Sequence, residues 1–440
     1  MCSLCARISR LRLLTSHGPA RASPAPVFDQ WPAGPETEAI VGRRILFLSQ
    51  RVPYPPDRGD RITTWNLVRH FLEQGHHVRI GCLCESDADD AAAAALRARG
   101  CEVMSARLRS KAWSLPWLVT RQPLTAAHFS SRRLLSELDA SLRREAADLV
   151  YAYSSSTGFW MQQLASRLGT THKVAHIAEL DSDKWAQYAR TQGVLGKWIY
   201  GREARLLLAA ERRLARFADV SVVCSPTEAA LFAQHVPGED VVVLPNGVDL
   251  EAFRPGDAQH VEAHSVVFTG VMDYLPNVDA VAWFAEQCWP GVRARFPDAQ
   301  FYVVGSAPVP RVRALHGRDG IEVTGYVPET VPWLQRAAVG VAPLHLARGI
   351  QNKVLEAMAC GLPSVVSTQA CQGIDAADGK HLVIADGARA TRDAVIALFA
   401  DTERARALGQ AARQRVEEYY RWETILQGME KWLWASNPGY

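Results

Sequence analysis

Short apolar runs alternate with longer amphipathic stretches along most of the chain. Residues 44–49 and 78–83 have the pattern of buried strands, and residues 61–74 between them have that of a helix ending at Gly75. The alternation continues with apolar runs at residues 149–153, 174–180 and 220–224 and an amphipathic stretch at residues 201–217. Such alternation predicts a parallel sheet with right-handed crossovers, whose ligands bind at the carboxyl ends of the strands.

The pattern is interrupted once and then starts again. Residues 254–264 are polar, and a second series begins at Val266. Its apolar runs each end at a glycine, at positions 270, 305 and 325. We therefore predict an α/β fold with two doubly wound domains, residues 43–255 and 256–440. Residues 1–42 are rich in Arg, Ala, Ser and Pro, and we expect them to form a disordered N-terminal extension.

Composition excludes several classes of protein. The 440 residues are 48% hydrophobic, which is enough for two separate cores. A net charge of +3 does not favour a nucleic-acid-binding protein. The nine cysteines are scattered, and no apolar run approaches the ~20 residues that span a bilayer. We expect a cytoplasmic protein, soluble or peripheral on a membrane.

The most informative segment is residues 348–363, RGIQNKVLEAMACGLP. Gly349 frees the backbone before a helix-forming run, which ends at Gly361 and precedes an apolar strand. The N–H groups at such a helix start attract phosphate, and Lys353 adds a full positive charge. Glu356 lies on the same face, where a carboxylate can accept hydrogen bonds from ribose hydroxyls. A solvated Lys353–Glu356 pair on an ordinary helix is the alternative.

The run from Glu356 to Pro363 resembles the carboxy-terminal signature of retaining GT-B glycosyltransferases of the family-4 type. The preceding Arg-Gly-Ile-Gln-Asn-Lys resembles a narrower branch, the sugar transferases associated with PEP-CTERM/exosortase and exopolysaccharide loci. The resemblance implies two Rossmann-like domains facing each other across a cleft, with the last helix, predicted at residues 401–434, packing back on the first domain. It also implies a nucleotide-diphosphate sugar as donor. Because the helix dipole and Lys353 can stabilise the departing diphosphate, we expect no metal or other cofactor.

The resemblance also assigns residues to the donor. The family usually carries a glutamate near the transferred sugar where this chain has Arg348, and often has an arginine and a lysine where Asp273 and Asn277 stand. Lys353, Arg348 and Arg58 are therefore the candidates for meeting the phosphate charge. The donor-binding residues expected in these loops are Gly59, Asp60, Gly270, Asp273, Asn277, Gly325, Tyr326, Val327, Arg348, Gly349, Ile350, Lys353 and Glu356. Turn and helix-cap chemistry remains the alternative for Asp273 and Asn277, and packing for Tyr326.

Asp181 is the candidate for orienting or deprotonating the acceptor, because it directly follows a predicted strand. Glu179 and His176 are its rivals, and a helix cap is the structural alternative. Residues 181–183 also spell Asp-x-Asp, the metal signature of the other major glycosyltransferase fold, so a metal-dependent site is a further alternative. The predicted catalytic set is Asp181, Lys353 and Glu356.

The stretch between Glu102 and Glu137 contains no acid, and its arginines alternate with Trp and Leu. This combination suits an anionic membrane surface, and a solvated helix pair is the alternative. The overall hypothesis is a retaining glycosyltransferase that acts on a lipid-linked or surface-polysaccharide acceptor, with possible peripheral contact with the inner membrane and no nucleic-acid partner. The alternatives are a nucleotide-sugar epimerase on the same fold and a non-catalytic sugar-nucleotide-binding partner subunit.

Overall fold

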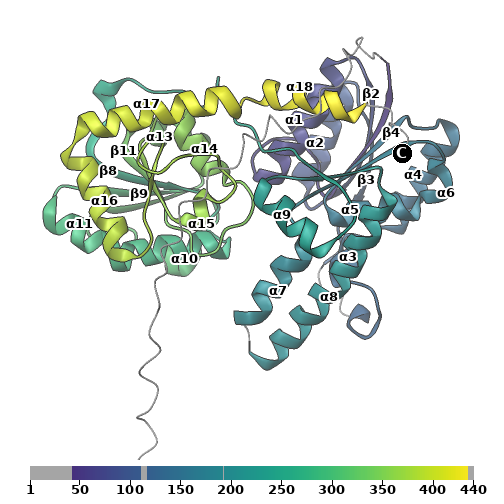
Figure 1. The fold of residues 1–440 in the computed structure, drawn as a ribbon, viewed down its shortest axis with the longest axis horizontal. Helices are drawn as coiled ribbons and strands as arrows, with labels where there is room; N and C mark the ends of the chain where they lie inside the picture. The colour runs from purple at the N-terminus through teal and green to yellow at the C-terminus, as the bar shows by residue number, and fades with distance from the viewer. Residues whose placement is uncertain (1–41, 111–115, 192, 435–440) are drawn as a thin grey trace, which may run out of the picture.

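The computed structural model of the 440-residue chain describes residues 42–110, 116–191 and 193–434. These residues form two α/β domains side by side (Figure 1). The predicted disorder concerns residues 1–42, which lie outside the described residues except for Gly42.

In the described part of the N-terminal domain, seven parallel strands lie in the order β3-β2-β1-β4-β5-β6-β7. Their bounds are β1 Arg44–Ser49, β2 His77–Cys84, β3 Glu102–Arg107, β4 Leu149–Tyr153, β5 His172–Ala178, β6 Val220–Val223 and β7 Val241–Val243. In the centre, Ile45 of β1 pairs with Val78 on one side and Leu149 on the other. The strand order reverses between β1 and β4, and ligands of such sheets bind at this switch point.

Helices cover both faces of this sheet, and each face has its own apolar core. Their bounds are α1 Gly59–Glu73, α2 Asp87–Ala98, α3 Leu124–His128, α4 Arg132–Arg144, α5 Ser155–Gln163, α6 Ala165–Leu168, α7 Asp181–Thr191, α8 Val194–Phe217 and α9 Pro226–His235. Helix α7 and the first turns of α8 were not predicted. They form a hairpin that projects from the domain (Figure 1), where Trp185 and Tyr200 pack with ring centroids 5.1 Å apart. Residues 181–200 lack the apolar period of a helix on a sheet, because the half-buried aromatic rings of this hairpin pack between its own two helices.

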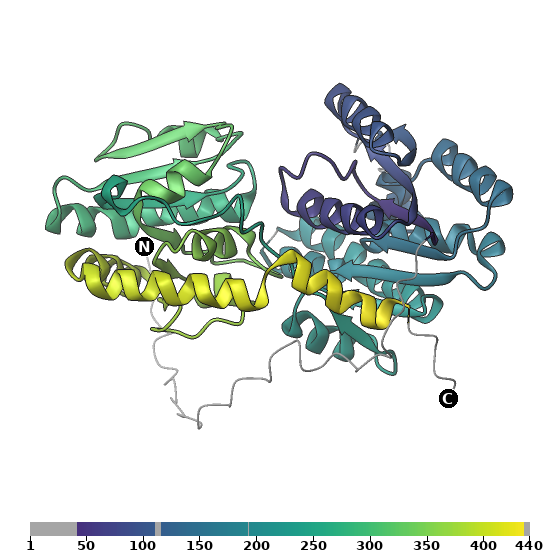
Figure 2. The same ribbon diagram turned by 90° about the horizontal axis from the view of Figure 1, so that it is seen from above.

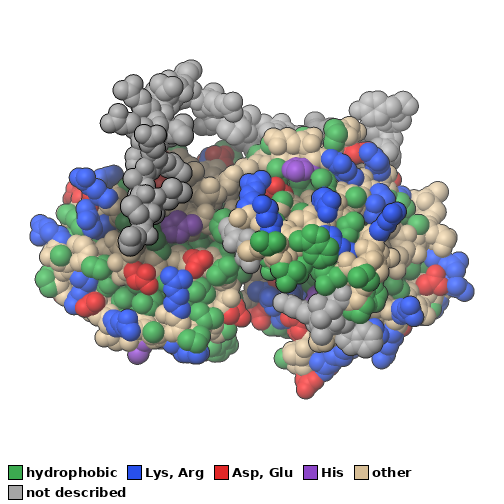
Figure 3. Space-filling view, turned by 90° about the horizontal axis from the view of Figure 1, so that it is seen from below, with side chains coloured by type: hydrophobic (Ala, Val, Ile, Leu, Met, Phe, Trp, Pro, Cys, Tyr) green, Lys and Arg blue, Asp and Glu red, His purple; other side chains and the backbone are tan. Residues whose placement is uncertain are grey.

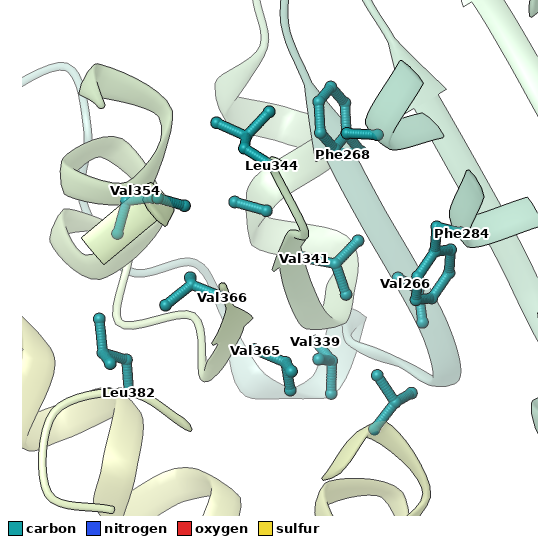
Figure 4. Packing of buried hydrophobic residues seen from close by; sticks show 14 of the residues in the cluster. Val266, Phe268, Phe284, Val339, Val341, Leu344, Val354, Val365, Val366 and Leu382 are labelled. Atoms are coloured by element: carbon teal, nitrogen blue, oxygen red, sulfur yellow. The ribbon is translucent and has the colours of Figure 1, made fainter. Parts of the chain in front are cut away.

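The described C-terminal domain has a six-stranded parallel sheet in the order β10-β9-β8-β11-β12-β13. The strands are β8 Glu262–Thr269, β9 Gln300–Val304, β10 Ile321–Gly325, β11 Ala337–Ala342, β12 Ser364–Val366 and β13 Val383–Ile384. The helices include α10 Leu275–Trp283, α11 Trp289–Arg295, α12 Pro310–Arg313, α13 Val331–Arg336, α14 Asn352–Ala359, α15 Thr368–Cys371 and α16 Ala388–Ala400. Figure 4 shows the buried side chains of Phe268, Val341 and Val366 on the strands, with Val354 of α14 packed in the same core. This packing fixes the position of α14 against the sheet.

The predicted helix at residues 401–434 is two helices, α17 Thr402–Tyr419 and α18 Trp422–Leu433. Helix α17 lies on the C-terminal domain and α18 on the N-terminal domain (Figure 2). At the break, the N–H of Val248 donates to the carbonyl of Tyr420 at 2.8 Å. Trp422, Ile425 and Met429 are buried in the core of the N-terminal domain, so the aromatic and aliphatic residues of this segment serve packing between the domains.

Candidate functional site

A cleft of about 2130 Å³ separates the two domains and is lined by loops from both sheets. The first turns of α1 and α14 lie close together there: a Cβ added at Gly59 would lie 3.6 Å from Asn352 Nδ2. Asn246, in the turn after β7, donates from Nδ2 to Asn352 Oδ1 at 3.0 Å. Neither helix has a side-chain hydrogen bond at its N-cap. Two uncapped helix N-termini thus border one space, an arrangement that favours an anion.

Lys353, in the first turn of α14, provides a cation at this place. Its Nζ donates to Asn277 Oδ1 at 2.5 Å and lies 4.4 Å from the centroid of the Phe268 ring. Asn277 in turn donates from Nδ2 to the carbonyl of Val271 at 2.9 Å. Asn277 therefore does serve turn chemistry, and it also orients the lysine toward the loop that follows β8.

Two glycines let the backbones after β8 and β9 approach each other beside this lysine. Gly270 has φ +155° and Gly305 has φ +148°, and a Cβ at Gly305 would lie 1.7 Å from the carbonyl oxygen of Gly270. A Cβ at Gly270 would lie 3.1 Å from Lys353 Nζ. Side chains at these positions would occupy the space in front of the lysine, so the glycines keep it open.

Burial gives Lys353 and Glu356 unusual protonation equilibria. Burial lowers the pKa of Lys353 to about 7, against the raising effect of Glu356. Burial likewise raises the pKa of Glu356 to about 7, against the lowering effect of Lys353. Perturbed ionisable groups in a cleft mark candidate functional sites. The solvated surface pair considered as an alternative does not describe these two side chains.

Comparisons with known proteins identify the fold and the kind of domains. The structure superimposes on sucrose-phosphate synthase from Thermosynechococcus elongatus with a TM-score of 0.66 at 20% identity, covering 88% of this chain and 98% of that one. Residues 58–247 match the family described as glycosyl transferase 4-like domain, and residues 263–401 match glycosyl transferases group 1. This chain is a GT-B glycosyltransferase.

Two relatives similar in sequence to this glycosyltransferase have names that specify both a sugar donor and an acceptor. The GDP-mannose-dependent alpha-(1-6)-phosphatidylinositol monomannoside mannosyltransferase of Mycobacterium tuberculosis is 27% identical over 266 residues, covering 56% of this chain and 68% of that protein. The UDP-Gal:alpha-D-GlcNAc-diphosphoundecaprenol alpha-1,3-galactosyltransferase of Escherichia coli is 25% identical over 244 residues, covering 51% of this chain and 59% of that protein.

Arg348 of the glycosyltransferase contacts the other domain. Its Nη2 donates to both carboxylate oxygens of Glu228, at 2.8 and 2.9 Å, and its Nη1 donates to Asp183. A Cβ at Gly349 would lie 2.3 Å from Glu179 Oε1, and its φ of +60° suits glycine. Arg348 and Gly349 line a separate cavity of about 310 Å³ beside the main cleft. The structure thus does not bring these two predicted donor residues into the main cleft lining, and their donor role stays a prediction.

Carboxylates of the N-terminal domain face the main cleft of the glycosyltransferase. Glu179 and Asp181 both line it, and burial raises the pKa of each, partly opposed by Lys184 and Arg348. Burial lowers the pKa of Lys184, but Asp181 and Glu179 outweigh it and the net shift is upward. His176 is fully buried, bonded through Nδ1 to the Tyr151 hydroxyl at 2.8 Å, and burial lowers its pKa to about 3. Asp181 and Glu179 thus line the main cleft and His176 does not, and the role of any of them toward an acceptor stays a prediction.

Most other predicted donor residues of the glycosyltransferase also line the main cleft. They are Gly59, Asp60, Gly270, Asp273, Asn277, Tyr326, Val327, Ile350, Lys353 and Glu356, with Arg58 beside them. Gly325 is not part of the lining. Arg58 forms ion pairs with Asp60 (Nε to Oδ1, 3.3 Å) and with Glu85 (Nη1 to Oε2, 3.6 Å). These two carboxylates partly neutralise the positive charge that Arg58 presents to a ligand.

Sequence reasoning missed three residues of the glycosyltransferase that line or border the cleft: Lys184, Asn246 and Gly305. Asn246 follows β7 and Gly305 follows β9, and a position at the carboxyl end of a strand is a signal that could have marked them. Lys184 lies on the unpredicted helix α7. Among the described residues, no group of three or more His, Cys, Asp or Glu side chains is placed to hold a metal ion.

Proposed function

We propose that the protein transfers a sugar, with retention of configuration, from a nucleotide-diphosphate sugar to a lipid-linked or surface-polysaccharide acceptor. The observation that carries the proposal is Lys353 at the uncapped start of α14, facing the space that Gly270 and Gly305 keep open. A diphosphate placed there meets a cation, a helix dipole and backbone N–H groups. Its ribose then lies one helical turn further on, at Glu356.

The reaction breaks the bond between the anomeric carbon and the β-phosphate oxygen and forms a bond from the acceptor hydroxyl to that carbon. Negative charge grows on the departing diphosphate, so Lys353 and the α14 N-terminus stabilise the transition state more than the bound donor. The hydroxyl proton passes to Asp181 or Glu179, or to the departing phosphate. A raised pKa makes either carboxylate a stronger base.

Two observations support a lipid-linked acceptor. The names of the two curated relatives specify a phosphatidylinositol mannoside and a diphosphoundecaprenol-linked sugar. In this chain the acceptor-facing end of the cleft is lined by apolar side chains, Leu124, Phe129 and Trp185, beside Arg109 and Lys184. Cations next to apolar surface suit an amphiphile with a phosphate group. None of the helices within the described ranges is both long and apolar enough to cross a membrane, and the proposed contact with the inner membrane is peripheral.

The test is incubation of the full chain with GDP-mannose, UDP-galactose and UDP-glucose, with and without a polyprenyl-diphosphate-linked acceptor. We expect nucleotide release that depends on the acceptor, and a product of retained anomeric configuration by NMR. An altered sugar without any acceptor would instead indicate an epimerase, which the relatives named above do not support. Donor binding without transfer or hydrolysis would indicate a non-catalytic partner subunit.

Replacing Glu356 with alanine is expected to weaken donor binding by roughly 1.5 to 3 kcal/mol, because a charged hydrogen bond to the ribose is lost. Calorimetric titration of the nucleoside diphosphate measures the change. The matched control is Glu329→Ala, which removes a carboxylate from the same cleft but from the loop after β10. Equal affinity of wild type and Glu356→Ala would contradict the assignment of the ribose to this residue.

Donor affinity is expected to be greatest near pH 7 and to fall on both sides. Lys353, whose pKa is lowered to about 7, loses its charge as the pH rises above that value, and diphosphate binding weakens. Glu356, whose pKa is raised to about 7, is neutral at lower pH and becomes a poorer acceptor for the ribose.

Calorimetry across the pH range measures this profile. In Glu356→Gln the decline on the acid side should disappear while the decline on the alkaline side remains. A flat profile in the wild type would contradict the prediction.

A further inference from the structure

The tip of the α7–α8 hairpin exposes large apolar side chains. Val194, Leu195 and Trp198 of α8 are 90%, 71% and 56% exposed, and Val119 of the neighbouring turn is 93% exposed. The three on α8 lie at positions i, i+1 and i+4, so they share one side of the helix. Exposed apolar groups gathered in this way mark an interaction surface.

The turn that carries Val119 is attached to α8. Arg202, one turn after Trp198, donates from Nη2 to the carbonyls of Trp117 at 2.7 Å and Thr120 at 2.5 Å. The two segments, distant in sequence, therefore form one surface. We name it the hairpin-tip surface: Val119, Val194, Leu195 and Trp198 with the exposed cations Arg121, Arg190 and Lys197.

The two segments that form this surface carry charge of a single sign. The sequence contains no acid between Asp183 and Glu203, nor between Glu102 and Glu137. Figure 3, seen from below, shows hydrophobic side chains gathered on this face of the N-terminal domain with Lys and Arg around them. Apolar side chains that include a Trp, bordered by cations, fit the interface of an anionic bilayer, where the apolar groups insert and the cations meet headgroup phosphates.

The position of the surface fits the reaction. The 11 residues of α7 run from Asp181, which lines the cleft, to the tip. At about 1.5 Å per residue the helix spans about 16 Å. A bilayer at the tip would therefore hold a lipid-linked acceptor with its head group within reach of the cleft.

We propose that the hairpin-tip surface docks on an anionic lipid bilayer. This inference rests on the proposed function, because a lipid-linked acceptor gives the docking its purpose. It places the contact on α8 and its neighbouring turn. The stretch predicted from sequence contributes Val119 and Arg121 to this surface, whereas its Arg107 is held by Asp87 and by Asp90, and its Lys111 lies outside the described residues.

The experiment is co-sedimentation of the full chain with vesicles of phosphatidylcholine, with or without phosphatidylglycerol. We expect the wild type to pellet with the anionic vesicles, and Leu195→Gln/Trp198→Gln to lower the partition coefficient by about tenfold or more. Arg190→Gln/Lys197→Gln should remove the preference for phosphatidylglycerol, as should raised salt. Two matched controls should behave like the wild type: Val261→Gln, at another exposed apolar residue, and Arg404→Gln/Arg406→Gln, at exposed cations of α17.

Wild type that stays in the supernatant with both vesicle types would overturn the proposal, as would equal pelleting of the Leu195→Gln/Trp198→Gln variant. The alternative is that a second copy of the chain covers this surface, and light scattering in the absence of lipid tests it. If the wild type is a dimer and the Leu195→Gln/Trp198→Gln variant is a monomer, the surface is a dimer interface and bilayer docking is overturned. Nucleoside-diphosphate binding, measured without vesicles, should be unchanged in the variant. If the wild type pellets but binds no nucleotide, the docking stands and the proposed transfer fails.

Discussion

Replacing Lys353 with methionine is expected to lower kcat by about 10² to 10³, because a cation aimed at the departing diphosphate is lost. KM should change less than kcat, since the negative charge is greatest in the transition state. The measurement is the rate of nucleotide release with the donor that the panel identifies. Methionine keeps the length and the apolar stem of the lysine, so its packing against Phe268 is retained.

Two comparisons separate this effect from damage to the fold. Burial lowers the pKa of Lys353, which means that the folded protein disfavours its charge, and Lys353→Met should therefore not lower the melting temperature. Lys380→Met removes an exposed lysine from the same domain and should leave kcat unchanged. Full activity of Lys353→Met would show that the diphosphate is stabilised by other groups.

Replacing Arg348 with alanine is expected to destabilise the protein by about 3 to 5 kcal/mol, because it leaves carboxylates without their partner in a largely buried place. The side chain of Glu228 is only 5% exposed and that of Asp183 is 17% exposed. Urea denaturation followed by tryptophan fluorescence measures the loss.

A second substitution tests whether the buried charge is the cause. In Arg348→Ala/Glu228→Gln the orphaned charge is removed, and part of the lost stability should return. Arg318→Ala, at an exposed arginine of the same domain, should change stability by less than about 0.5 kcal/mol. If Arg348→Ala keeps its stability but loses donor affinity, the sequence-based assignment of Arg348 to the donor is right and the interdomain role is wrong.

Most of the architecture could be predicted from the sequence, because the hydrophobic periods of buried parallel strands and amphipathic helices are local. The strand predicted at residues 44–49 is β1 Arg44–Ser49, and the helix predicted at residues 61–74 is α1 Gly59–Glu73. The comparisons confirm the GT-B fold. Errors occurred where local signals were weak: the break at Tyr420 has neither glycine nor proline to mark it.

The candidate site was predictable only in part. The signature around Glu356 placed Lys353 and Glu356 together, since three residues on a helix fix their relative position. Contacts across the cleft depend on how the domains pack, so the partners of Arg348 could not be read from spacing. Glu228 follows Ser225 by three residues, which is the spacing of a helix N-terminal capping box. Ser225 does accept from the Glu228 N–H at 3.2 Å, but the carboxylate of Glu228 turns to Arg348.

The return of α18 to the N-terminal domain limits how the two domains can move. The chain passes between them twice, and the two passages lie side by side where Val248 pairs with Arg421. Sliding the domains past each other or pulling them apart would break the Val248–Arg421 pairing and expose Trp422, which is buried in the core of the N-terminal domain. A relative displacement of the domains that keeps both passages paired is therefore limited to rotation about the line that they share.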